Sequence, residues 1–132
     1  LGFAPFGINQ ATFQLTSPRA APAEGPLHIF AGGNDRTRDW RTLVEAFAGQ
    51  DDIEVDIYCG WMPAELVKGV DNIRIIRSMT INEFVTAIRS ADIAAVPMRT
   101  NLFSGITFAL NSASLGTPIL CSRTGGVPSY FA

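Results

Sequence analysis

Short apolar runs alternate with stretches of helical periodicity along most of the chain. Residues 27–31 form a compact apolar run closed by Gly32 and Gly33, which is typical of a strand buried on both faces. Similar runs predict four further strands, at residues 53–58, 73–76, 92–97 and 118–121.

Between these strands, apolar residues recur at helical spacing. One such stripe predicts a helix over residues 38–48, which Gly49 stops. Thr80 with Glu83 forms a capping-box signature, and it predicts a helix that ends near Ser90. Further helical segments are predicted at residues 63–67, at 105–115 and from 125 onward.

Strands separated by helices of about ten residues favour right-handed crossovers and a parallel sheet covered on both faces. The predicted fold class is therefore α/β, a doubly wound parallel sheet of the Rossmann-like kind. Ligands of such sheets lie outside the carboxyl ends of the strands, near the point where the strand order reverses. This directs attention to the loops after residues 31, 58, 76, 97 and 121.

The residues before the first strand form a separate piece. We expect residues 1–15 to be a junction segment, with a brief strand at 3–6 and Phe13 as an anchor onto the main body. Three prolines among small residues predict a surface linker at 16–26. Residues 27–132 then form the main domain. A length of 132 residues suits one domain, so a second domain must come from elsewhere if the function needs one.

Composition narrows the function classes. An apolar content of 47% is enough to fill a core, and it excludes disorder as the main state. The net charge of -2 gives no general attraction to nucleic acid or to an anionic membrane. Cys59 and Cys121 lie far apart without a C-x-x-C pattern, so we expect reduced thiols and a cytoplasmic location. Apolar runs stay far below the length of about 18 residues of a membrane span, and no signal-peptide pattern begins the sequence.

The loop over residues 32–39 carries the first candidate chemistry. Gly32 and Gly33 let backbone N–H groups approach a ligand, and Arg36 and Arg38 stand at a predicted helix start. Helix starts and guanidinium groups both bind phosphate oxygens, so the loop suits a diphosphate. A plain turn with solvated arginines explains it equally well from these residues alone. The loop lacks G-x-G-x-x-G, which removes the main support for a dinucleotide-dependent oxidoreductase.

The segment 103–111 is the second candidate. Gly105 and Ile106 would offer amides at a helix start, while Thr107 and Asn111 fall four residues apart on one helix face. The alternative is that Ser104 merely caps the helix. A third loop, at residues 122–128, is explained equally well by an ordinary strand-to-helix turn.

The other titratable residues give weaker evidence for a functional role. His28 lies within a predicted buried strand, so we expect a hydrogen-bonded core histidine and not a catalytic one. Asp51, Asp52 and Glu54 show no metal-ligand spacing and are interpreted as a solvated loop, so no metal site is predicted. The sequence has no G-x-S-x-G, H-E-x-x-H or P-loop motif, and no catalytic residue is assigned.

Six segments follow one another in a recognisable order. They lie at residues 3–13, 32–47, 57–60, 91–97, 104–118 and 125–128. The fifth reads S-G-I-T-F-A-L-N-S-A-S-L-G-T-P, similar to S-G-x-T-x-L-L-E-A-M-A-x-G-x-P, and the last is G-G-V-P. Together they resemble the C-terminal, nucleotide-sugar-binding domain of retaining GT-B glycosyltransferases, the group 1 or family 4-like kind. The resemblance covers nearly the whole chain.

The resemblance implies a retaining hexosyltransferase that uses a UDP-, GDP- or ADP-sugar as substrate, with no other cofactor and no metal. Arg38, together with Arg36 and the Gly32–Gly33 turn, would bind the diphosphate. The remaining assignments place the distal phosphate at Ser104, Gly105, Ile106 and Thr107, the ribose at Asn111, and the base at Ser78 and Met79. An N-terminal acceptor-binding domain is the implied partner. Without it the chain is expected to be inactive, and the full enzyme of this family can associate peripherally with a membrane.

The chain also differs from the family pattern at three positions. Asn111 and Phe103 stand where the family has a pair of glutamates, and Gly33 stands where an arginine is common. These differences favour an alternative, a GT-B-like module that no longer catalyses and serves as a binding or assembly surface. The sequence also stops where the family's sheet continues, so we expect the domain to be truncated at its C-terminus.

Overall fold

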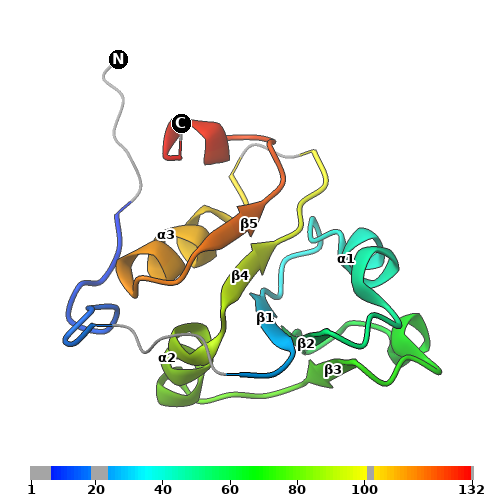
Figure 1. Ribbon diagram of the computed structural model, residues 1–132. Helices are drawn as coiled ribbons and strands as arrows, with labels where there is room; N and C mark the ends of the chain where they lie inside the picture. The colour runs from blue at the N-terminus through cyan, green and yellow to red at the C-terminus, as the bar shows by residue number, and fades with distance from the viewer. Residues whose placement is uncertain (1–6, 19–23, 101–102, 132) are drawn as a thin grey trace.

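The computed structural model describes residues 7–18, 24–100 and 103–131. Its centre is a five-stranded, entirely parallel sheet with the strand order β3-β2-β1-β4-β5 (Figure 1). The strands are β1 (Leu27–Gly32), β2 (Ile53–Tyr58), β3 (Ile73–Ile76), β4 (Ile93–Val96) and β5 (Ile119–Cys121). The chain runs outward from β1 to β3 and then crosses back to β4, so the strand order reverses between β1 and β4. The predicted doubly wound α/β fold is confirmed.

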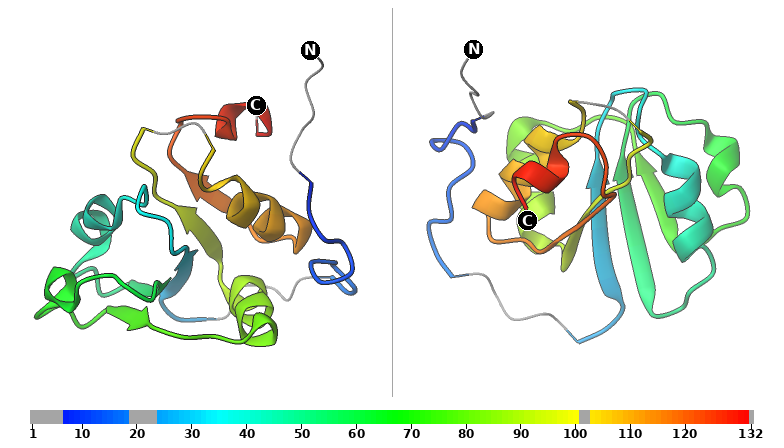
Figure 2. Two further views of the ribbon diagram at one scale, coloured as in Figure 1. Left: turned by 180° about the vertical axis from the view of Figure 1, so that it is seen from behind. Right: turned by 90° about the horizontal axis from the view of Figure 1, so that it is seen from above.

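Helices cover both faces of the sheet, as the view from above shows (Figure 2). The helix α1 (Trp40–Phe47) lies on one face, and α2 (Ile81–Ser90) and α3 (Ile106–Ser114) lie on the other. Two short 3-10 turns complete the described elements, η1 (Ala64–Val67) and η2 (Val127–Ser129). Helices or, between β2 and β3, a 3-10 turn connect the parallel strands, as the alternation in the sequence predicted.

Each face of the sheet has its own apolar core. Ile29, Val55 and Ile57 point to the face that α1 covers, where they pack with Trp40 and Leu43. The alternate residues point to the opposite face, because successive side chains of a strand alternate. There Phe30 meets the rings of Phe84 and Phe108 at centroid distances of 5.8 and 6.0 Å.

The predicted start is correct for one helix, α2, and wrong for another, α1. The capping box at α2 is confirmed, since Thr80 accepts from the Glu83 amide and the Glu83 carboxylate accepts from the Thr80 amide. The helix predicted to begin at residue 38 begins instead at Trp40. Arg38 is held in an antiparallel bridge to the chain after β4, and Asp39 caps the helix by accepting from the Thr42 amide.

The described N-terminal residues contact the main body through Phe13 and, beyond it, through a hydrogen bond from Arg89 to the Ser17 hydroxyl. Phe13 is buried in the core that contains Phe30 and Ile88, as the anchor prediction required. Residues 16–18 and 24–26, on either side of an undescribed stretch, are exposed. The strand expected at residues 3–6 lies outside the described residues.

His28 differs from its prediction in position but not in bonding. Its Nε2 lies 3.1 Å from Asp56 Oδ2, and Arg74 binds the same carboxylate at 2.7 and 2.8 Å. The His28 side chain is nevertheless 28% exposed, because an open groove of about 490 Å³ runs between this part of the sheet and α2. It is a satisfied histidine, but it lies at the surface and not in the core.

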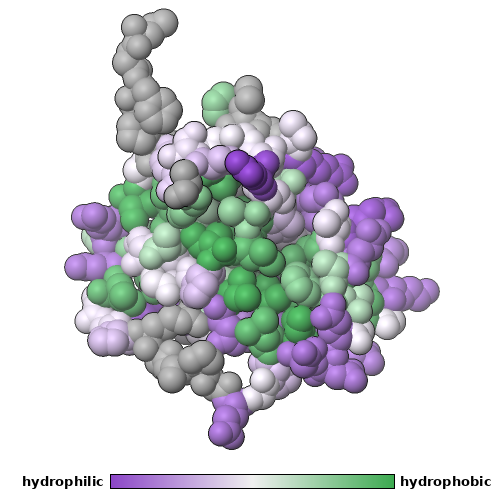
Figure 3. Space-filling model, turned by 45° about the horizontal axis from the view of Figure 1, so that its top comes forward, coloured by the Kyte–Doolittle hydropathy of each residue, from purple (hydrophilic) through white to green (hydrophobic). Residues whose placement is uncertain are grey.

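The sheet ends in an exposed strand. Leu120 on β5 is 49% exposed, although it belongs to a strand with apolar neighbours. Figure 3, with the top of the molecule turned forward, shows apolar residues gathered in the middle of the view beside charged ones.

Both cysteines are free, with Cys59 buried and Cys121 half-buried. Across the described ranges, no helix is long and apolar enough to cross a membrane.

Candidate functional site

The loop between β1 and α1 is fixed to the end of β4. The Asp39 amide donates to the Pro97 carbonyl at 3.0 Å, and the Arg99 amide donates to the Thr37 carbonyl at 2.9 Å. Arg38 lies between these two bonds and bridges to Met98. The loop therefore lies at the carboxyl edge of the sheet, where the strand order reverses and a ligand of this class of fold is expected.

Arg38 is the buried centre of this loop. Only 5% of its surface is exposed, and its Nε donates to Asp35 Oδ2 at 2.9 Å. Its guanidinium carbon lies 5.8 Å from the centre of the Phe108 ring. Burial lowers the pKa of Arg38, and the neighbouring Asp35 carboxylate opposes that shift. Among the described residues, its Nη1 has no hydrogen-bond partner.

Asp35 joins the loop to the segment that precedes α3. Its carboxylate accepts from the Thr37 hydroxyl at 2.6 Å and from the Thr37 amide at 3.2 Å, and it also bonds the Ser104 side chain. Burial raises the pKa of Asp35, but hydrogen bonds from Ser104 and Thr37 and the charge of Arg38 outweigh it, so the pKa lies below its ordinary value. An anionic carboxylate thus lies between the guanidinium and the start of α3.

The start of α3 depends on a glycine. Gly105 has a φ of 85°, and an added Cβ would lie 2.9 Å from Met98 Sδ and 3.0 Å from Val96 Cγ1. Only glycine combines this left-handed backbone with so close an approach to the end of β4. The glycine brings the first amides of α3 to the same edge of the sheet as the β1–α1 loop.

Apart from Gly32 and Arg36, the predicted site residues fall into three groups. In the first, Arg38 and Ser104 both bond the Asp35 carboxylate, with Gly33 against the Arg38 side chain and Gly105 next to Ser104 in the chain. The next group lies along α3, where Ile106 is buried, Thr107 is exposed and Asn111 is only 6% exposed. The last group follows β3, which β2 separates from β1, and there Ser78 is exposed and Met79 packs against the apolar core.

The missing side chains of Gly32 and Gly33 leave room for different neighbours. A Cβ on Gly32 would lie 2.9 Å from the Phe84 ring and 3.1 Å from the Phe108 ring. A Cβ on Gly33 would lie 2.3 Å from Arg38 Nε. Gly32 thus makes room for the aromatic core, and Gly33 makes room for the buried guanidinium. Arg38 can keep this position only because residue 33 has no side chain.

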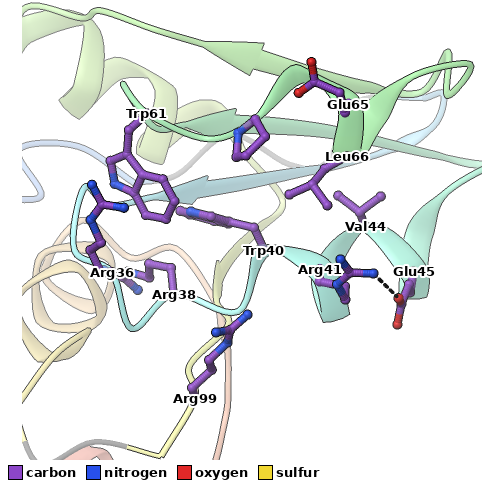
Figure 4. A pocket seen from close by; sticks show the side chains of 11 residues that line it. Arg36, Arg38, Trp40, Arg41, Val44, Glu45, Trp61, Glu65, Leu66 and Arg99 are labelled. Atoms are coloured by element: carbon purple, nitrogen blue, oxygen red, sulfur yellow. Dashed lines mark ion pairs between the residues drawn. The ribbon is translucent and has the colours of Figure 1, made fainter.

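Arg36 contacts a different loop from Arg38. Its guanidinium carbon lies 4.9 Å above the centre of the Trp61 ring, and Figure 4 shows the two side chains together. Trp61 Nε1 donates to the Asn34 carbonyl at 2.8 Å, and the Asn34 side chain accepts from the Gly60 amide at 2.8 Å. The loop after β2 is therefore bonded to the loop after β1, and Arg36 belongs to this contact.

Three of these residues were missed by sequence reasoning. Asp35, Asn34 and Trp61 carry no motif, and each has a partner on another loop or at the start of another helix. One signal was available, because Trp61 lies in the loop that follows the second strand and must lie at the same edge as the first loop. Beside it is a cavity of about 770 Å³ between α1 and η1 (Figure 4).

The fold is similar to that of two solved structures, one of which is the C-terminal domain of a glycosyl transferase group 1 family protein. Sucrose-phosphate synthase from Thermosynechococcus elongatus superposes with a TM-score of 0.73 at 22% identity, over 93% of this chain and 35% of that chain. The C-terminal domain of a glycosyl transferase group 1 family protein from Francisella tularensis gives a TM-score of 0.68 at 20% identity, over 92% and 73% of the two chains.

These similarities concern the fold. The chain spans about a third of the length of the sucrose-phosphate synthase chain and about three quarters of the Francisella domain. No protein-family model and no curated protein matches the sequence. The resemblance suggested by the sequence motifs is thus supported at the level of three-dimensional structure.

Proposed function

We propose that this chain is the donor-binding domain of a retaining glycosyltransferase, a hexosyltransferase that uses a nucleotide-diphosphate sugar. The observation that carries the proposal is the position of the Asp35 carboxylate, bonded to Arg38 and Ser104 where the strand order reverses. A negatively charged group therefore already lies where this class of fold binds its ligands. The fold of the two glycosyltransferase neighbours supports the same conclusion.

The proposed diphosphate site uses donors from two segments. Arg38 supplies a buried positive charge, and the Ser104 hydroxyl and the first amides of α3 supply hydrogen bonds at the positive end of the helix dipole. Asp35 uses two of the same donors, so a bound diphosphate must displace its carboxylate. Donor binding in this proposal therefore includes a rearrangement of Asp35.

In the transfer, the bond between the anomeric carbon and the diphosphate oxygen breaks, an acceptor hydroxyl oxygen forms a bond to the same carbon and gives its proton to the leaving phosphate, and negative charge develops on the leaving nucleoside diphosphate. Arg38 and the start of α3 would stabilise that charge without a separate cofactor. Ser78 and Met79 are proposed to lie beside the base, and Asn111 to meet the ribose. An N-terminal domain is proposed to hold the acceptor, and turnover is expected only when that domain is present.

A nucleotide titration tests the proposal. The melting temperature of the chain is followed with UDP, GDP and ADP, and a ligand at about 100 times its Kd should add about 2.7 kcal/mol of stability. Ser104→Ala should weaken the productive nucleotide by about tenfold, since hydrogen bonds to charged groups contribute about 1.5–3 kcal/mol. Ser90→Ala, at the far end of α2, is the control and should bind like the unchanged chain.

A second candidate has an observation of its own. Asp35 fills the anion site from within the chain, and Asn111 stands buried where the family has a glutamate. Both features suit a GT-B-like module that binds or assembles without catalysis. Asp35→Asn separates the two functions. If the chain is a donor-binding domain, the substitution should strengthen nucleotide binding by removing the competing charge. If it is a non-catalytic module, nucleotides should leave the melting temperature of both the unchanged chain and the variant unaltered.

A further inference from the structure

The single histidine of the chain lies among carboxylates at the amino end of the sheet. His28 is the second residue of β1, and the strand register pairs it with Glu54 on β2. Asp56 follows two residues later on the same face of the sheet, and its Oδ2 lies 3.1 Å from His28 Nε2. On the other side of β1, Asp92 Oδ2 accepts from the His28 amide at 2.9 Å. Carboxylates thus flank His28 from both sides of its strand.

The charges around His28 have an excess of one sign. Arg74 on β3 supplies positive charge, and it binds the Asp56 carboxylate at 2.7 and 2.8 Å. The other acidic residues that border the two open cavities beside His28 are Asp51, Glu54, Asp71 and Glu83. Among the described residues around it, negative charge therefore exceeds positive charge while His28 is neutral. Because like charges repel, protonation of the imidazole relieves this excess.

The imidazole of His28 can exchange protons with water. Its side chain is 28% exposed, in the groove between the sheet and α2. The hydrogen bond to Asp56 raises its pKa most strongly, and burial opposes the rise. The charges of Asp56, Asp92 and Glu54 add to it, so the pKa lies above its ordinary value of 6.5. A raised pKa stabilises the fold below pH 6.5, and this contribution is lost as the pH rises through the pKa of the folded chain.

The start of β1 depends on the same group of residues. The Leu27 amide donates to the Asp52 carbonyl at 2.7 Å, and the Asp92 amide donates to the His28 carbonyl at 2.8 Å. Leu27 is exposed and His28 half-buried, whereas the last four residues of β1 are buried. Few apolar contacts therefore support the first two residues of the strand, and the electrostatic balance around His28 acts on that part of the sheet.

We propose that His28, with Glu54, Asp56, Arg74 and Asp92, forms a pH-sensitive switch at the amino end of the sheet. The protonated imidazole holds the start of β1 against β2 and against the residue that precedes β4. When the imidazole is neutral, the excess of negative charge loosens residues 27–29. The switch does not depend on the proposed sugar transfer, because the proposed donor site lies at the opposite, carboxyl edge of the sheet.

Proton NMR tests the switch directly, because a single histidine gives one ring C2 proton resonance to follow with pH. The titration midpoint of the folded chain is expected above 6.5. Asp56→Asn removes the bonded carboxylate and should lower the midpoint. Glu65→Gln is the matched control, since it neutralises an exposed carboxylate on η1, beside α1 on the other face of the sheet, and should leave the midpoint unchanged.

Stability measurements test the consequence of the titration. Histidine is the side chain that ordinarily titrates between about pH 6 and about pH 8, and burial raises the pKa of Cys121 above its ordinary value of 9.0. Urea unfolding should therefore show a stability that falls over this range. The unfolding equilibrium constant should increase about tenfold for each unit by which the NMR midpoint exceeds 6.5. His28→Gln should remove this dependence on pH.

Hydrogen exchange distinguishes local loosening from a change in overall stability. Amides of residues 27–29 should lose protection relative to those of residues 94–96 as the pH rises, and the comparison within one chain cancels the intrinsic effect of pH on exchange. His28→Gln should keep the ratio constant. If that variant does not fold, Asp56→Asn should reduce the pH dependence in step with its lower midpoint. The proposal is overturned if the midpoint lies at or below 6.5, if Glu65→Gln lowers it as much as Asp56→Asn, if His28→Gln retains the fall in stability, or if the exchange ratio of the unchanged chain is independent of pH.

Discussion

Gly33→Ala tests whether the buried guanidinium of Arg38 needs the space that glycine leaves. The added methyl carbon would lie 2.3 Å from Arg38 Nε and 2.7 Å from its Nη2. Nε is the atom that donates to Asp35 at 2.9 Å, so the side chain cannot stay in place without breaking that bond. The guanidinium must leave its position or push the loop outward.

The cost follows from these contacts. Losing a hydrogen bond between charged groups costs about 1.5–3 kcal/mol, and overpacking adds about 1–3 kcal/mol. We expect Gly33→Ala to lower the free energy of unfolding by about 3 kcal/mol and the melting temperature by roughly 10 °C. Thermal and urea unfolding measure both quantities. Nucleotide binding should also weaken if Arg38 holds the diphosphate.

Gly60→Ala is the matched control on the neighbouring loop. Its added carbon would lie 3.5 Å from Asn34 Oδ1 and 3.7 Å from the Arg77 carbonyl, which are ordinary contacts. We expect this variant to unfold within about 0.5 kcal/mol of the unchanged chain. Equal melting temperatures for the two variants would refute the buried, anchored position of Arg38 and the role assigned to Gly33.

Three further predictions concern stability. Gly105→Ala should cost at least 1 kcal/mol more than Gly49→Ala, since both have left-handed φ but only Gly105 meets other side chains; urea unfolding compares them. Thr80→Ala should cost about 1 kcal/mol through loss of the α2 cap, measured by thermal melting, and an unchanged melting temperature would contradict the capping box. Burial raises the pKa of Asp56, but the hydrogen bonds and charges of His28 and Arg74 outweigh it and lower the pKa from 3.8 to about 2. This depressed pKa stabilises the fold above about pH 4 by up to about 2 kcal/mol, which is lost as the pH falls from 4 to 2, and Asp56→Asn should abolish that part of the acid dependence.

Local patterns predicted the elements of the fold well. The run at β1 closed by two glycines, and the Thr80 and Glu83 pair at α2, act within one turn or one strand, so the sequence alone carries their signal. Parallel pairing followed from strands separated by short helices. The start of α1 was misplaced because Arg38 is held by Met98, sixty residues away along the chain, and no local pattern encodes that bridge.

The sequence predicted which loops meet at the edge of the sheet, but not the contacts between them. The loop after β1 and the start of α3 do meet at the carboxyl edge, since the topology requires it. The sequence could not show that Arg38 would be buried with Asp35 as its partner, because burial depends on Phe108 and on the missing side chain at Gly33. Arg36 was expected to act with Arg38, but its guanidinium lies over the Trp61 ring, a contact with another loop that no local pattern encodes.

The hydrogen bonds of Asn34 have a mechanical consequence. Its amide oxygen and its carbonyl hold Gly60 and Trp61, while Thr37 on the same loop holds Arg99. Hydrogen bonds thus join three loops that are distant in the sequence, those after β1, β2 and β4, at the carboxyl edge of the sheet. A ligand that moves the β1–α1 loop would therefore also change the surroundings of Trp61, so the fluorescence of that tryptophan is expected to report the movement.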